Sequence, residues 1–462
     1  MKSNLFDNHS GIVSGRGIHL DLKGLAPTFS RLLELVKLFK KLKFQTILVE
    51  WEDMFPWTCD QRMRNTHAYT EAEILEFAKI CQACDLSIIP LVQSLGHAEN
   101  VLRQPGNESL REMPNRTDVF HPLNPRAPEL VRRMVEDVLN LIPNVDYVHL
   151  GGDEVYTLGK NPRTKNYLKQ HGEAALYMLQ LKPTMDLLKS KSIRPMLWHD
   201  EVVRWEDDQI RQFSKYADLV VWGYTGDPRD AQTYHFRLPH VEKLSALGCQ
   251  LWGTTAYKGA DGPKANLTNT LDREKATIGW TKLASKFELK GVFATGWSRY
   301  ASGRIQVTPI DSALDSMVNT AAILYNGDVA TDNLAVATKW LEEAGEGGIF
   351  NKLRTLLSKL TTHTDNSWNW VRELEEQVAN LTVEPARSNS GIEEIIFELF
   401  NADIAEIKKI SEELADVLAG YVVAPQNELY CRPRLLAIES AAESLRLRLE
   451  LDADYKLMPK NA

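Results

Sequence analysis

The hydrophobic and polar positions of the first 325 residues follow two alternating periods. Short apolar runs are separated by longer stretches in which apolar residues recur every three or four positions. The short runs are typical of strands and the longer stretches of amphipathic helices. The clearest helical stretches are residues 28–41, 71–84 and 128–141. The apolar runs predict eight strands, at residues 17–22, 44–51, 86–92, 147–150, 194–198, 219–222, 250–254 and 291–295.

Eight apolar strands that alternate with amphipathic helices predict an α/β fold. Parallel strands need a helical crossover and are buried on both faces, so their sequences are apolar throughout. Eight such units favour a closed (β/α)8 TIM barrel over an open doubly wound sheet. We therefore expect a barrel domain at residues 12–325, preceded by an N-terminal extension at residues 1–11.

The pattern changes after residue 325, where only the helical period remains. This part of the chain predicts an all-helical C-terminal domain at residues 326–462, packed on the barrel or used for oligomerisation, including as a homodimer. The predicted helices are residues 334–343, 352–362, 370–381, 391–418 and 434–451.

The composition is that of an ordinary globular protein. Of the 462 residues, 44% are hydrophobic and 25% are charged, and the formal net charge is -8. An acidic chain without a basic stripe argues against nucleic acid or an anionic membrane as the main partner. The first residues lack the apolar run of a secretory signal, and five cysteines are an odd, sparse number. We therefore expect a cytoplasmic protein.

Carboxylates and indole rings dominate the predicted strand ends, where the chemistry of such barrels resides. Trp198, Trp222 and Trp297 end three different strands at the same level. A single Trp at such a position is more often barrel packing. Three beside paired acids favour a sugar site, since the C–H face of a sugar ring stacks on an indole.

The acid pair Asp153 and Glu154 follows the fourth apolar run and two glycines. Glycines at this point allow a ligand to approach the backbone closely. Two carboxylates at one strand end can differ in pKa, so that one acts as a general acid while the other stays ionised. An isolated Asp-Glu pair is usually a solvated turn, and its position after a buried strand is what favours chemistry here.

The segment around the acid pair, His149-Leu150-Gly151-Gly152-Asp153-Glu154-Val155, resembles the signature of glycoside hydrolase family 20, the β-N-acetylhexosaminidases. The resemblance extends over residues 12–325. Within the family, the chain is most similar to the hexosaminidase D branch. Further segments that resemble the family's motifs are Arg16-Gly17-Ile18-His19-Leu20-Asp21, Gly96-His97, Leu123-Asn124-Pro125, Trp198-His199-Asp200-Glu201 and Trp297-Ser298.

The resemblance implies a retaining exo-β-N-acetylhexosaminidase acting by substrate-assisted catalysis, in which the substrate's acetamido oxygen attacks the anomeric carbon and forms an oxazolinium intermediate. It implies that Glu154 is the acid and then the base, a role for which we expect a raised pKa. It implies that Asp153 holds the acetamido N–H. Asp21 and His97 resemble a relay that supports Glu154.

The resemblance also implies which residues form the substrate pocket. No metal or cofactor is expected, because the first strand carries one histidine, His19, where metal-binding barrels carry His-x-His. Arg16 is expected to hold ring hydroxyls, and the three Trp residues to form the acetamido pocket. Tyr224 and Tyr257 are both candidates for the tyrosine that donates to the acetamido oxygen. The expected substrate is a terminal β-linked GalNAc or GlcNAc of a glycan.

Two departures from the family's motifs fall on groups that contact the sugar's O4 or O6. Gly259 stands where the family has an aspartate, and Arg299 stands where it has a glutamate. We therefore leave GalNAc or GlcNAc open, with a leaning to GalNAc from the hexosaminidase D branch. Glu52, Asp53 and Glu99 are candidates for the missing hydroxyl acceptor. The alternative functions are a non-catalytic amino-sugar-binding barrel and a scaffold that acts through its helical domain.

Overall fold

A computed structural model describes residues 5–6, 11–328, 333–383 and 392–449 of the chain. The chain divides into two compact units, Met1–Gly347 and Gly348–Ala462. Most of the expected extension at residues 1–11 lies outside the described residues.

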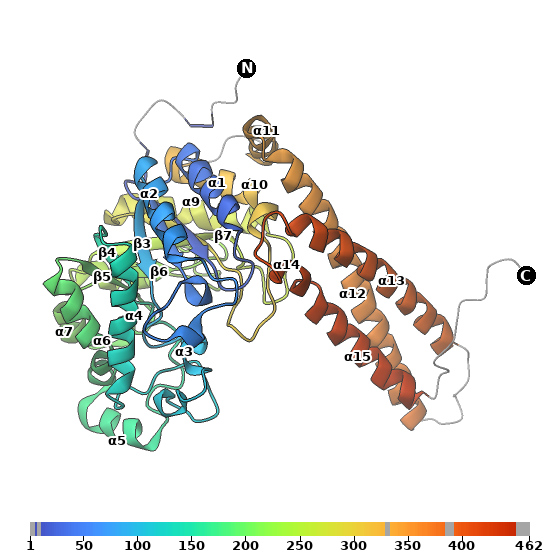
Figure 1. Ribbon diagram of the computed structural model, residues 1–462, viewed down its shortest axis with the longest axis horizontal. Helices are drawn as coiled ribbons and strands as arrows, with labels where there is room; N and C mark the ends of the chain where they lie inside the picture. Colours follow the sequence, from blue (N-terminus) through green and yellow to red (C-terminus); the bar gives the residue numbers. More distant parts are fainter. Residues whose placement is uncertain (1–4, 7–10, 329–332, 384–391, 450–462) are drawn as a thin grey trace, which may run out of the picture. The chain divides into compact units, whose positions relative to one another are not determined.

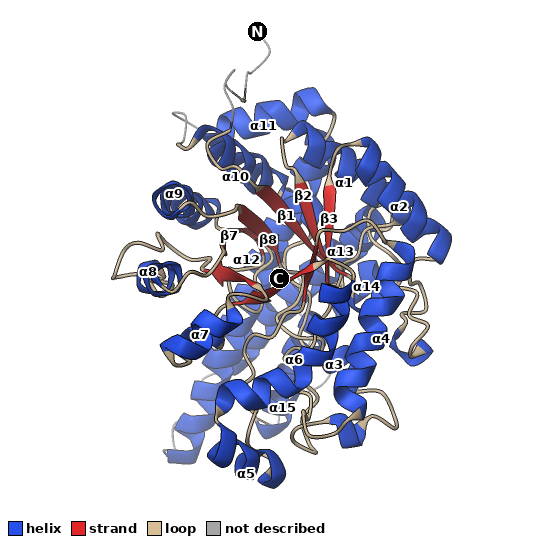
Figure 2. Ribbon diagram, turned by 90° about the vertical axis from the view of Figure 1, so that its left-hand side faces the viewer, coloured by secondary structure: helices blue, strands red, loops and turns tan. Residues whose placement is uncertain are grey.

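Eight parallel strands of the first unit close into a barrel in the order β1 to β8, which confirms the predicted fold. Figure 2 shows the strands at the centre of this unit and the helices around them. Strand β4 is the shortest and pairs with β3 through a single residue pair, Leu91 and His149. The strands are β1 (Arg16–Asp21), β2 (Thr46–Glu50), β3 (Ser87–Leu91), β4 (Tyr147–His149), β5 (Arg194–Trp198), β6 (Asp218–Trp222), β7 (Leu251–Lys258) and β8 (Val292–Gly296).

Side-chain capping supports some of the helices of the first unit. Helix α2 begins with a capping box, in which Thr70 and Glu73 satisfy each other's backbone N–H groups. The helices are α1 (Phe29–Lys41), α2 (Glu71–Ala83), α3 (Glu99–Leu102), α4 (Arg126–Leu141), α5 (Pro162–His171), α6 (Glu173–Ser190), α7 (Asp207–Phe213), α8 (Leu238–Ala246), α9 (Thr270–Phe287), α10 (Leu314–Asn326) and α11 (Asn333–Ala344).

Large side chains fill the interior of the barrel. Trp198, Trp252 and Phe293 pack there with aliphatic residues of the other strands, and Trp252 stacks on Phe293 with ring centroids 5.1 Å apart. Gly17 makes room for this packing, because a Cβ at that position would lie 2.1 Å from the Phe293 ring. The interior of the barrel is therefore packed with side chains rather than hollow.

The second unit consists of helices α12 (Gly347–Val383), α13 (Ile392–Leu418), α14 (Gln426–Leu429) and α15 (Arg432–Arg448). Figure 1 shows the three long helices side by side. The helical character of this region agrees with the sequence pattern. The two helices expected at residues 352–362 and 370–381 are, however, one continuous helix, α12.

Residues 363–369, which the pattern left between those two helices, are stabilised partly by contacts with α13, which a local pattern does not contain. The Thr364 and Ser367 hydroxyls donate to the carbonyls four residues earlier. Asp403 of α13 accepts hydrogen bonds from His363 Nδ1 at 2.6 Å and from Trp370 Nε1 at 2.8 Å. Packing against α13 therefore overrides the weak helix propensity of this stretch.

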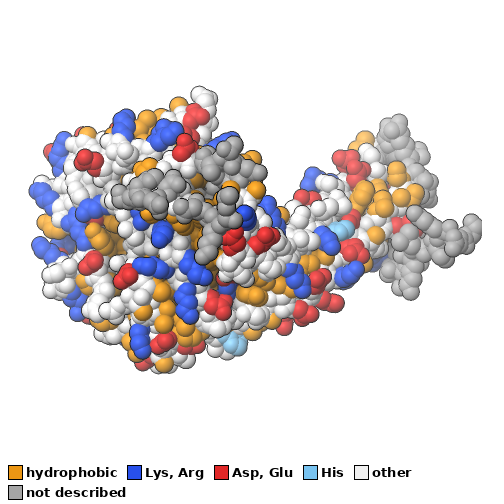
Figure 3. Space-filling view, turned by 90° about the horizontal axis from the view of Figure 1, so that it is seen from above, with side chains coloured by type: hydrophobic (Ala, Val, Ile, Leu, Met, Phe, Trp, Pro, Cys, Tyr) orange, Lys and Arg blue, Asp and Glu red, His pale blue; other side chains and the backbone are white. Residues whose placement is uncertain are grey.

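Charged side chains of both signs are interspersed on the face that Figure 3 shows, without a single-sign stripe. None of the helices in the described part combines the length and apolar character needed to cross a bilayer.

A buried ion pair joins helix α1 to the segment between β8 and α10. Arg31 donates to Asp311 Oδ1 through Nε and Nη2, at 2.9 and 2.6 Å, and both side chains are 4% exposed. We expect Asp311→Ala to lower the free energy of unfolding by about 3 kcal/mol, because it removes the main counter-charge of a buried guanidinium. Urea unfolding followed by tryptophan fluorescence measures this change.

Glu34→Ala is the matched control, since it removes an exposed partner of the same Arg31. Its expected cost is below about 1 kcal/mol. Equal losses in the two variants would contradict the assignment of the stability to the buried pair.

Candidate active site

The loop after β4 carries the acid pair and is held by hydrogen bonds from neighbouring elements. The backbone N–H of Gly151 donates to His149 Nδ1 at 3.0 Å, and the Gly151 carbonyl accepts from the backbone N–H of Trp198. The Tyr177 hydroxyl of α6 donates to the Gly152 carbonyl at 2.8 Å. Gly152 has a φ of 84°, and a Cβ there would lie 2.2 Å from that hydroxyl. The two glycines are therefore required by the geometry of the loop.

Glu154 has a left-handed backbone with a φ of 49°, which is uncommon for a residue with a side chain. Such a conformation costs about 1 kcal/mol or more and persists only where the surroundings impose it. Here the Glu154 N–H donates to Asp200 Oδ2 at 3.0 Å, and its carbonyl accepts from the Tyr156 N–H at 2.8 Å. Backbone strain of this kind is typical of functional sites.

Both carboxylate oxygens of Asp200 accept hydrogen bonds from groups of the site. Oδ2 accepts from Glu154, and Oδ1 accepts from the indole N–H of Trp222 at 3.1 Å. Burial, and then the nearby charge of Asp153, raise the pKa of Asp200 to about 6. One carboxylate therefore positions both the acid residue and an aromatic wall.

His97 contacts both members of the acid pair. Its Nε2 lies 3.4 Å from Asp153 Oδ2 and 3.3 Å from Glu154 Oε2, and its own φ is 49°. Burial alone would lower the pKa of His97, but the two acids raise it well above its usual value. The other Asp153 oxygen, Oδ1, is buried, and none of the residues that the structure describes forms a hydrogen bond with it. Asp153 therefore offers a free acceptor beside His97.

The pKa of Glu154 differs from the expectation for a general acid. The hydrogen bond from His97 is the main cause that lowers it below its usual value, while burial alone would raise it. The expected raised pKa is therefore wrong for the site without a ligand, because the sequence does not show that a histidine cation lies beside this carboxyl.

A cavity of about 330 Å³ opens at this end of the barrel, a size typical of small-molecule sites. Trp222, Tyr224 and Trp297 form its aromatic wall, and Trp222 stacks on Tyr224 with ring centroids 5.7 Å apart. The cavity is lined by Lys23, Gln93, His97, Asp153, Glu154, Trp222, Tyr224, Thr225, Tyr234, His235, Gly259, Ala260, Trp297, Arg299 and Tyr300.

A buried polar cluster borders the cavity at Lys23. The Lys23 ammonium lies 2.9 Å from Glu50 Oε1 and 3.6 Å from Asp21 Oδ1. Burial would lower the pKa of Lys23, but these acids raise it well above its usual value. Gln93 donates to the same Glu50 oxygen, and its own Oε1 is buried with no hydrogen-bond partner in the described part of the chain. This wall therefore combines a fixed cation with a free amide acceptor.

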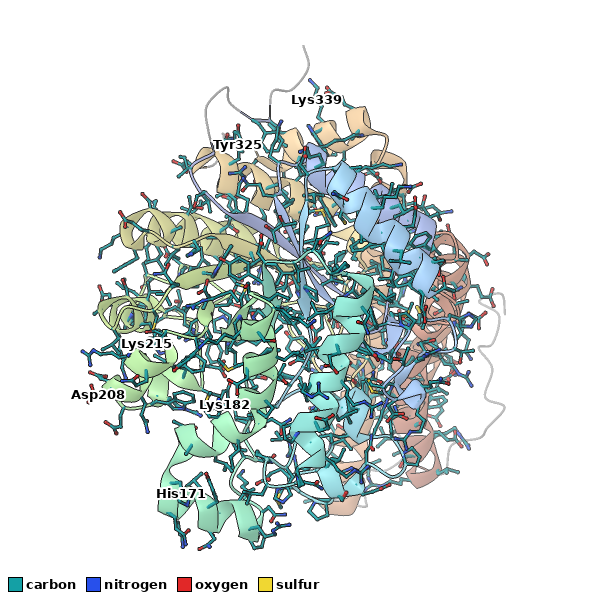
Figure 4. All side chains as sticks on the ribbon, turned by 60° about the vertical axis from the view of Figure 1, so that its left-hand side comes forward. His171, Lys182, Asp208, Lys215, Tyr325 and Lys339 are labelled. Carbon is teal, nitrogen blue, oxygen red and sulfur yellow. The ribbon has the colours of Figure 1, made fainter. Side chains whose placement is uncertain are left out.

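Six of the predicted site residues line one cavity: Asp153, Glu154, His97, Trp222, Tyr224 and Trp297. Arg16 is not among them, and its assignment to ring hydroxyls is wrong. It begins β1, so its side chain lies at the amino end of the barrel. There it donates to the Val13 and Lys43 carbonyls and lies 5.0 Å from the ring of Tyr325, which Figure 4 labels.

Trp198 and Tyr257 are both buried and do not belong to the wall of the cavity. Trp198 is part of the barrel core and lies 6.1 Å from Trp297, which it supports from beneath. The Tyr257 hydroxyl lies 3.5 Å from the His19 carbonyl, to which it donates. The expected contact of Trp198 with substrate is therefore wrong, and Tyr224 is the tyrosine of the two candidates that lines the cavity.

Asp21 lies in the buried cluster and not beside His97. It accepts hydrogen bonds from the backbone N–H groups of Lys23 and Ser298, both at 2.8 Å. The two halves of the expected relay are thus separate, with His97 alone in contact with the acids. Among the residues that the structure describes, the cavity wall contains neither Glu52, Asp53 nor Glu99.

Lys23, Gln93, Asp200 and His235 belong to the site but were not predicted for it. Lys23, Gln93 and Asp200 follow the ends of strands β1, β3 and β5, so strand direction was a usable signal. His235 had no such signal, because it lies in the long loop after β6. Its Nδ1 accepts from the backbone N–H groups of Tyr224 and Thr225, at 2.9 and 3.1 Å.

Comparison with known proteins gives one family. Residues 46–306 match the profile described as glycosyl hydrolase family 20, catalytic domain. A curated relative named hexosaminidase D, from Bos taurus, is 30% identical over 326 residues, which are 68% of this chain and 93% of the relative. The hexosaminidase D of Homo sapiens is 30% identical over 328 residues, covering 69% of this chain and 67% of that one.

Solved structures share the fold at low identity. A chitobiase of Flavobacterium johnsoniae superposes with a TM-score of 0.56 at 16% identity, covering 97% of this chain and 74% of that one. A beta-N-acetylhexosaminidase of Bacteroides fragilis gives a TM-score of 0.54 at 15% identity, covering 73% and 72%. These likenesses support the barrel fold.

The contact between His97 and Glu154 can be tested by titration. In His97→Gln we expect the pKa of Glu154 to rise, because a nearby positive charge no longer favours the ionised carboxylate. NMR titration of the carboxyl carbon measures this shift. His171→Gln is the control on an exposed histidine of α5, which Figure 4 labels. An unchanged Glu154 pKa in His97→Gln would rule out the contact as its cause.

Proposed function

Because this chain belongs to glycosyl hydrolase family 20 and is a glycoside hydrolase, we propose that it is a retaining exo-β-N-acetylhexosaminidase. The proposed substrate is a terminal β-linked GalNAc or GlcNAc. The observation that carries the proposal is the acid pair at the barrel mouth. Asp153 offers a free buried oxygen there, Glu154 lies beside it, and aromatic rings line the same cavity.

Asp153 is proposed to hold the acetamido group of the substrate. Among the described residues its Oδ1 has no hydrogen-bond partner, so it can accept the acetamido N–H. When the acetamido oxygen attacks the anomeric carbon, positive charge develops on that nitrogen. The hydrogen bond to the carboxylate therefore strengthens in the transition state, which is what accelerates a reaction.

Glu154 is proposed to protonate the departing glycosidic oxygen and then to deprotonate the incoming water. The first step requires a proton on Glu154, and the second requires the carboxylate that this proton transfer leaves behind. In the free site, however, His97 lowers the pKa of Glu154. A bound sugar excludes water from this carboxyl, and desolvation favours the protonated form. The acid form of Glu154 is thus proposed to arise when substrate binds.

The remaining walls are proposed to recognise the sugar. Trp222 and Trp297 flank the acetamido group, and Tyr224, whose side chain lies against Thr254 and near Asp153, donates to its oxygen. Lys23 and Gln93 take the role first assigned to Arg16 and hold ring hydroxyls. The Lys23 ammonium is the proposed donor to these hydroxyls, and Gln93 Oε1 is the proposed acceptor.

The proposed preference is for GalNAc. Gly259 lines the cavity and provides no side-chain acceptor. A larger residue would not fit at this position, because its Cβ would lie 2.1 Å from the Trp297 carbonyl oxygen. Arg299 lines the same cavity as a donor, with a buried Nε that has no partner. The family's usual acceptors for O4 or O6 are therefore absent, and the likeness to the hexosaminidase D branch favours GalNAc.

The acid pair gives the first kinetic prediction. Glu154→Gln should lower kcat by about a thousandfold, because it removes the proton that leaves with the aglycone. Asp153→Asn should lower kcat by about a hundredfold, because an amide does not stabilise the oxazolinium charge. The assay is hydrolysis of paired aryl β-GalNAc and β-GlcNAc glycosides, with a higher kcat/KM expected for GalNAc.

Asp208→Asn, on the exposed surface of α7 (Figure 4), is the matched control and should keep full activity. A wild-type protein that binds the amino sugar without hydrolysing it would leave the non-catalytic binding barrel as the function. A nearly unchanged rate in Glu154→Gln would remove this residue from its role.

Asp200 gives a second kinetic prediction, because it joins Glu154 to Trp222. In Asp200→Asn an amide NH₂ group replaces one of the two oxygens that accept hydrogen bonds from Glu154 and Trp222, so that one donor faces another. We expect the resulting misplacement of Glu154 to lower kcat by about tenfold to a hundredfold. Trp222→Phe keeps a ring but removes the indole N–H. The double variant should lose less than the product of the single losses, because both act on one carboxylate. Multiplicative losses would show that the two contacts are independent.

A further inference from the structure

The long loop between β6 and α8 is joined back to its own beginning by His235. The Nδ1 atom of this histidine accepts the backbone N–H of Tyr224 at 2.9 Å and that of Thr225 at 3.1 Å. A ring nitrogen that accepts hydrogen bonds carries no proton, so the proton of the neutral ring is on Nε2. Burial, and then the charge of Arg237, lower the pKa of His235 to about 4, which keeps the ring in this form at neutral pH.

The two N–H groups that His235 accepts depend on it alone, whereas the neighbouring backbone groups have other partners. The Gly223 N–H donates to the Thr254 carbonyl at 3.2 Å, and the Gly223 carbonyl accepts from the Trp280 indole at 2.8 Å. Among the described residues, His235 is the one hydrogen-bond acceptor for the N–H groups of residues 224 and 225. Removal of its Nδ1 would therefore leave two adjacent donors unsatisfied.

Tyr224 is the side chain of the site that these bonds hold in place. Its hydroxyl hydrogen-bonds Thr254 and lies close enough to Asp153 for that charge to raise its pKa. The His235 ring lies at right angles to the rings of Tyr224 and Trp222, with centroids 5.8 and 5.4 Å apart. The backbone and the ring of Tyr224 are thus both in contact with His235.

The position of the Tyr224 hydroxyl matters for the reaction, because its proposed partner is the attacking atom. In the proposed function this hydroxyl donates to the acetamido oxygen while that oxygen approaches the anomeric carbon. A small displacement of the hydroxyl changes the direction of the attack, and misplacement of a reacting group is costly in rate. The Nδ1 contacts of His235 therefore reach the reaction through Tyr224.

We infer that His235 is a positioning residue, which fixes the backbone after β6 through Nδ1 and so aims the Tyr224 hydroxyl at the acetamido oxygen. The inference rests on the proposed function, since it takes the role of Tyr224 from it. The alternative is a direct contact between His235 and the ligand, because His235 also lines the cavity. That contact would use Nε2, so the two roles belong to different ring nitrogens.

Two substitutions separate the two nitrogens. In His235→Asn the amide oxygen lies near the former position of Nδ1 and can accept two hydrogen bonds, whereas His235→Gln places its amide near the former position of Nε2. With an aryl β-GalNAc glycoside, His235→Asn should keep kcat within about threefold of the wild type, and His235→Gln should lower it by about tenfold with little change in KM. His235→Ala, which removes both nitrogens, should lose as much as His235→Gln.

The same losses should depend on the Tyr224 hydroxyl. In a Tyr224→Phe background, which itself lowers kcat, the further loss from His235→Gln or His235→Ala should be below about twofold, because both changes act on one group. A histidine that merely stabilised the fold would cost the same with and without that hydroxyl. Thermal unfolding of each variant shows whether it is folded at the assay temperature.

Thr233→Val is the matched control in the same loop. The Thr233 hydroxyl donates to the Asp227 and Asp230 carbonyls at 3.0 and 2.9 Å, and its side chain does not line the cavity. This variant loosens the loop without touching the end of β6, so its kcat should equal that of the wild type.

Three results would overturn the inference. They are a His235→Asn variant as slow as His235→Ala, a His235→Gln variant as fast as the wild type, and an undiminished loss in the Tyr224→Phe background. The first two together would assign His235 to direct contact through Nε2. Failure of the wild-type protein to hydrolyse the aryl glycoside would instead overturn the proposed hydrolase function, so the two failures are distinct.

Discussion

The hydrogen bond from the Glu154 backbone to Asp200 is the interaction on which the rest of the site depends. Two glycines bring the chain out of β4 in a conformation that few residues adopt, and Glu154 continues it with a positive φ. Without an acceptor for its N–H, this strained residue would relax and its carboxyl would move. Because the second oxygen of Asp200 holds the Trp222 indole, the acid and the aromatic wall keep one fixed spacing.

Much of this arrangement could be predicted from the sequence, for a physical reason. Strands of a parallel barrel are buried on both faces, so their apolar runs stand out, and the residues just after them meet at one end. The acid pair, His97, Trp222, Tyr224 and Trp297 were found in this way or through motifs. Arg16 was assigned to the wrong end of the barrel, because the assignment followed the family motif and did not consider that Arg16 begins its strand. Lys23, seven residues later, lies at the correct end.

The remaining differences come from contacts between residues distant in sequence. A ring at a strand end can point into the core or into the cavity, and Trp198 and Trp222 are alike in sequence pattern although only Trp222 lines the cavity. The pKa of Glu154 depends on His97, which another loop supplies. The continuity of α12 depends on Asp403 of α13. Such effects appear only once the chain has folded.

The packed floor of the barrel closes the site from below. Since Trp198, Trp252 and Phe293 occupy the interior of the barrel, no ligand can pass along its axis. A molecule that reaches the acid pair must therefore enter and leave on the same side of the barrel. A departing molecule has to clear this opening before the next one can take its place.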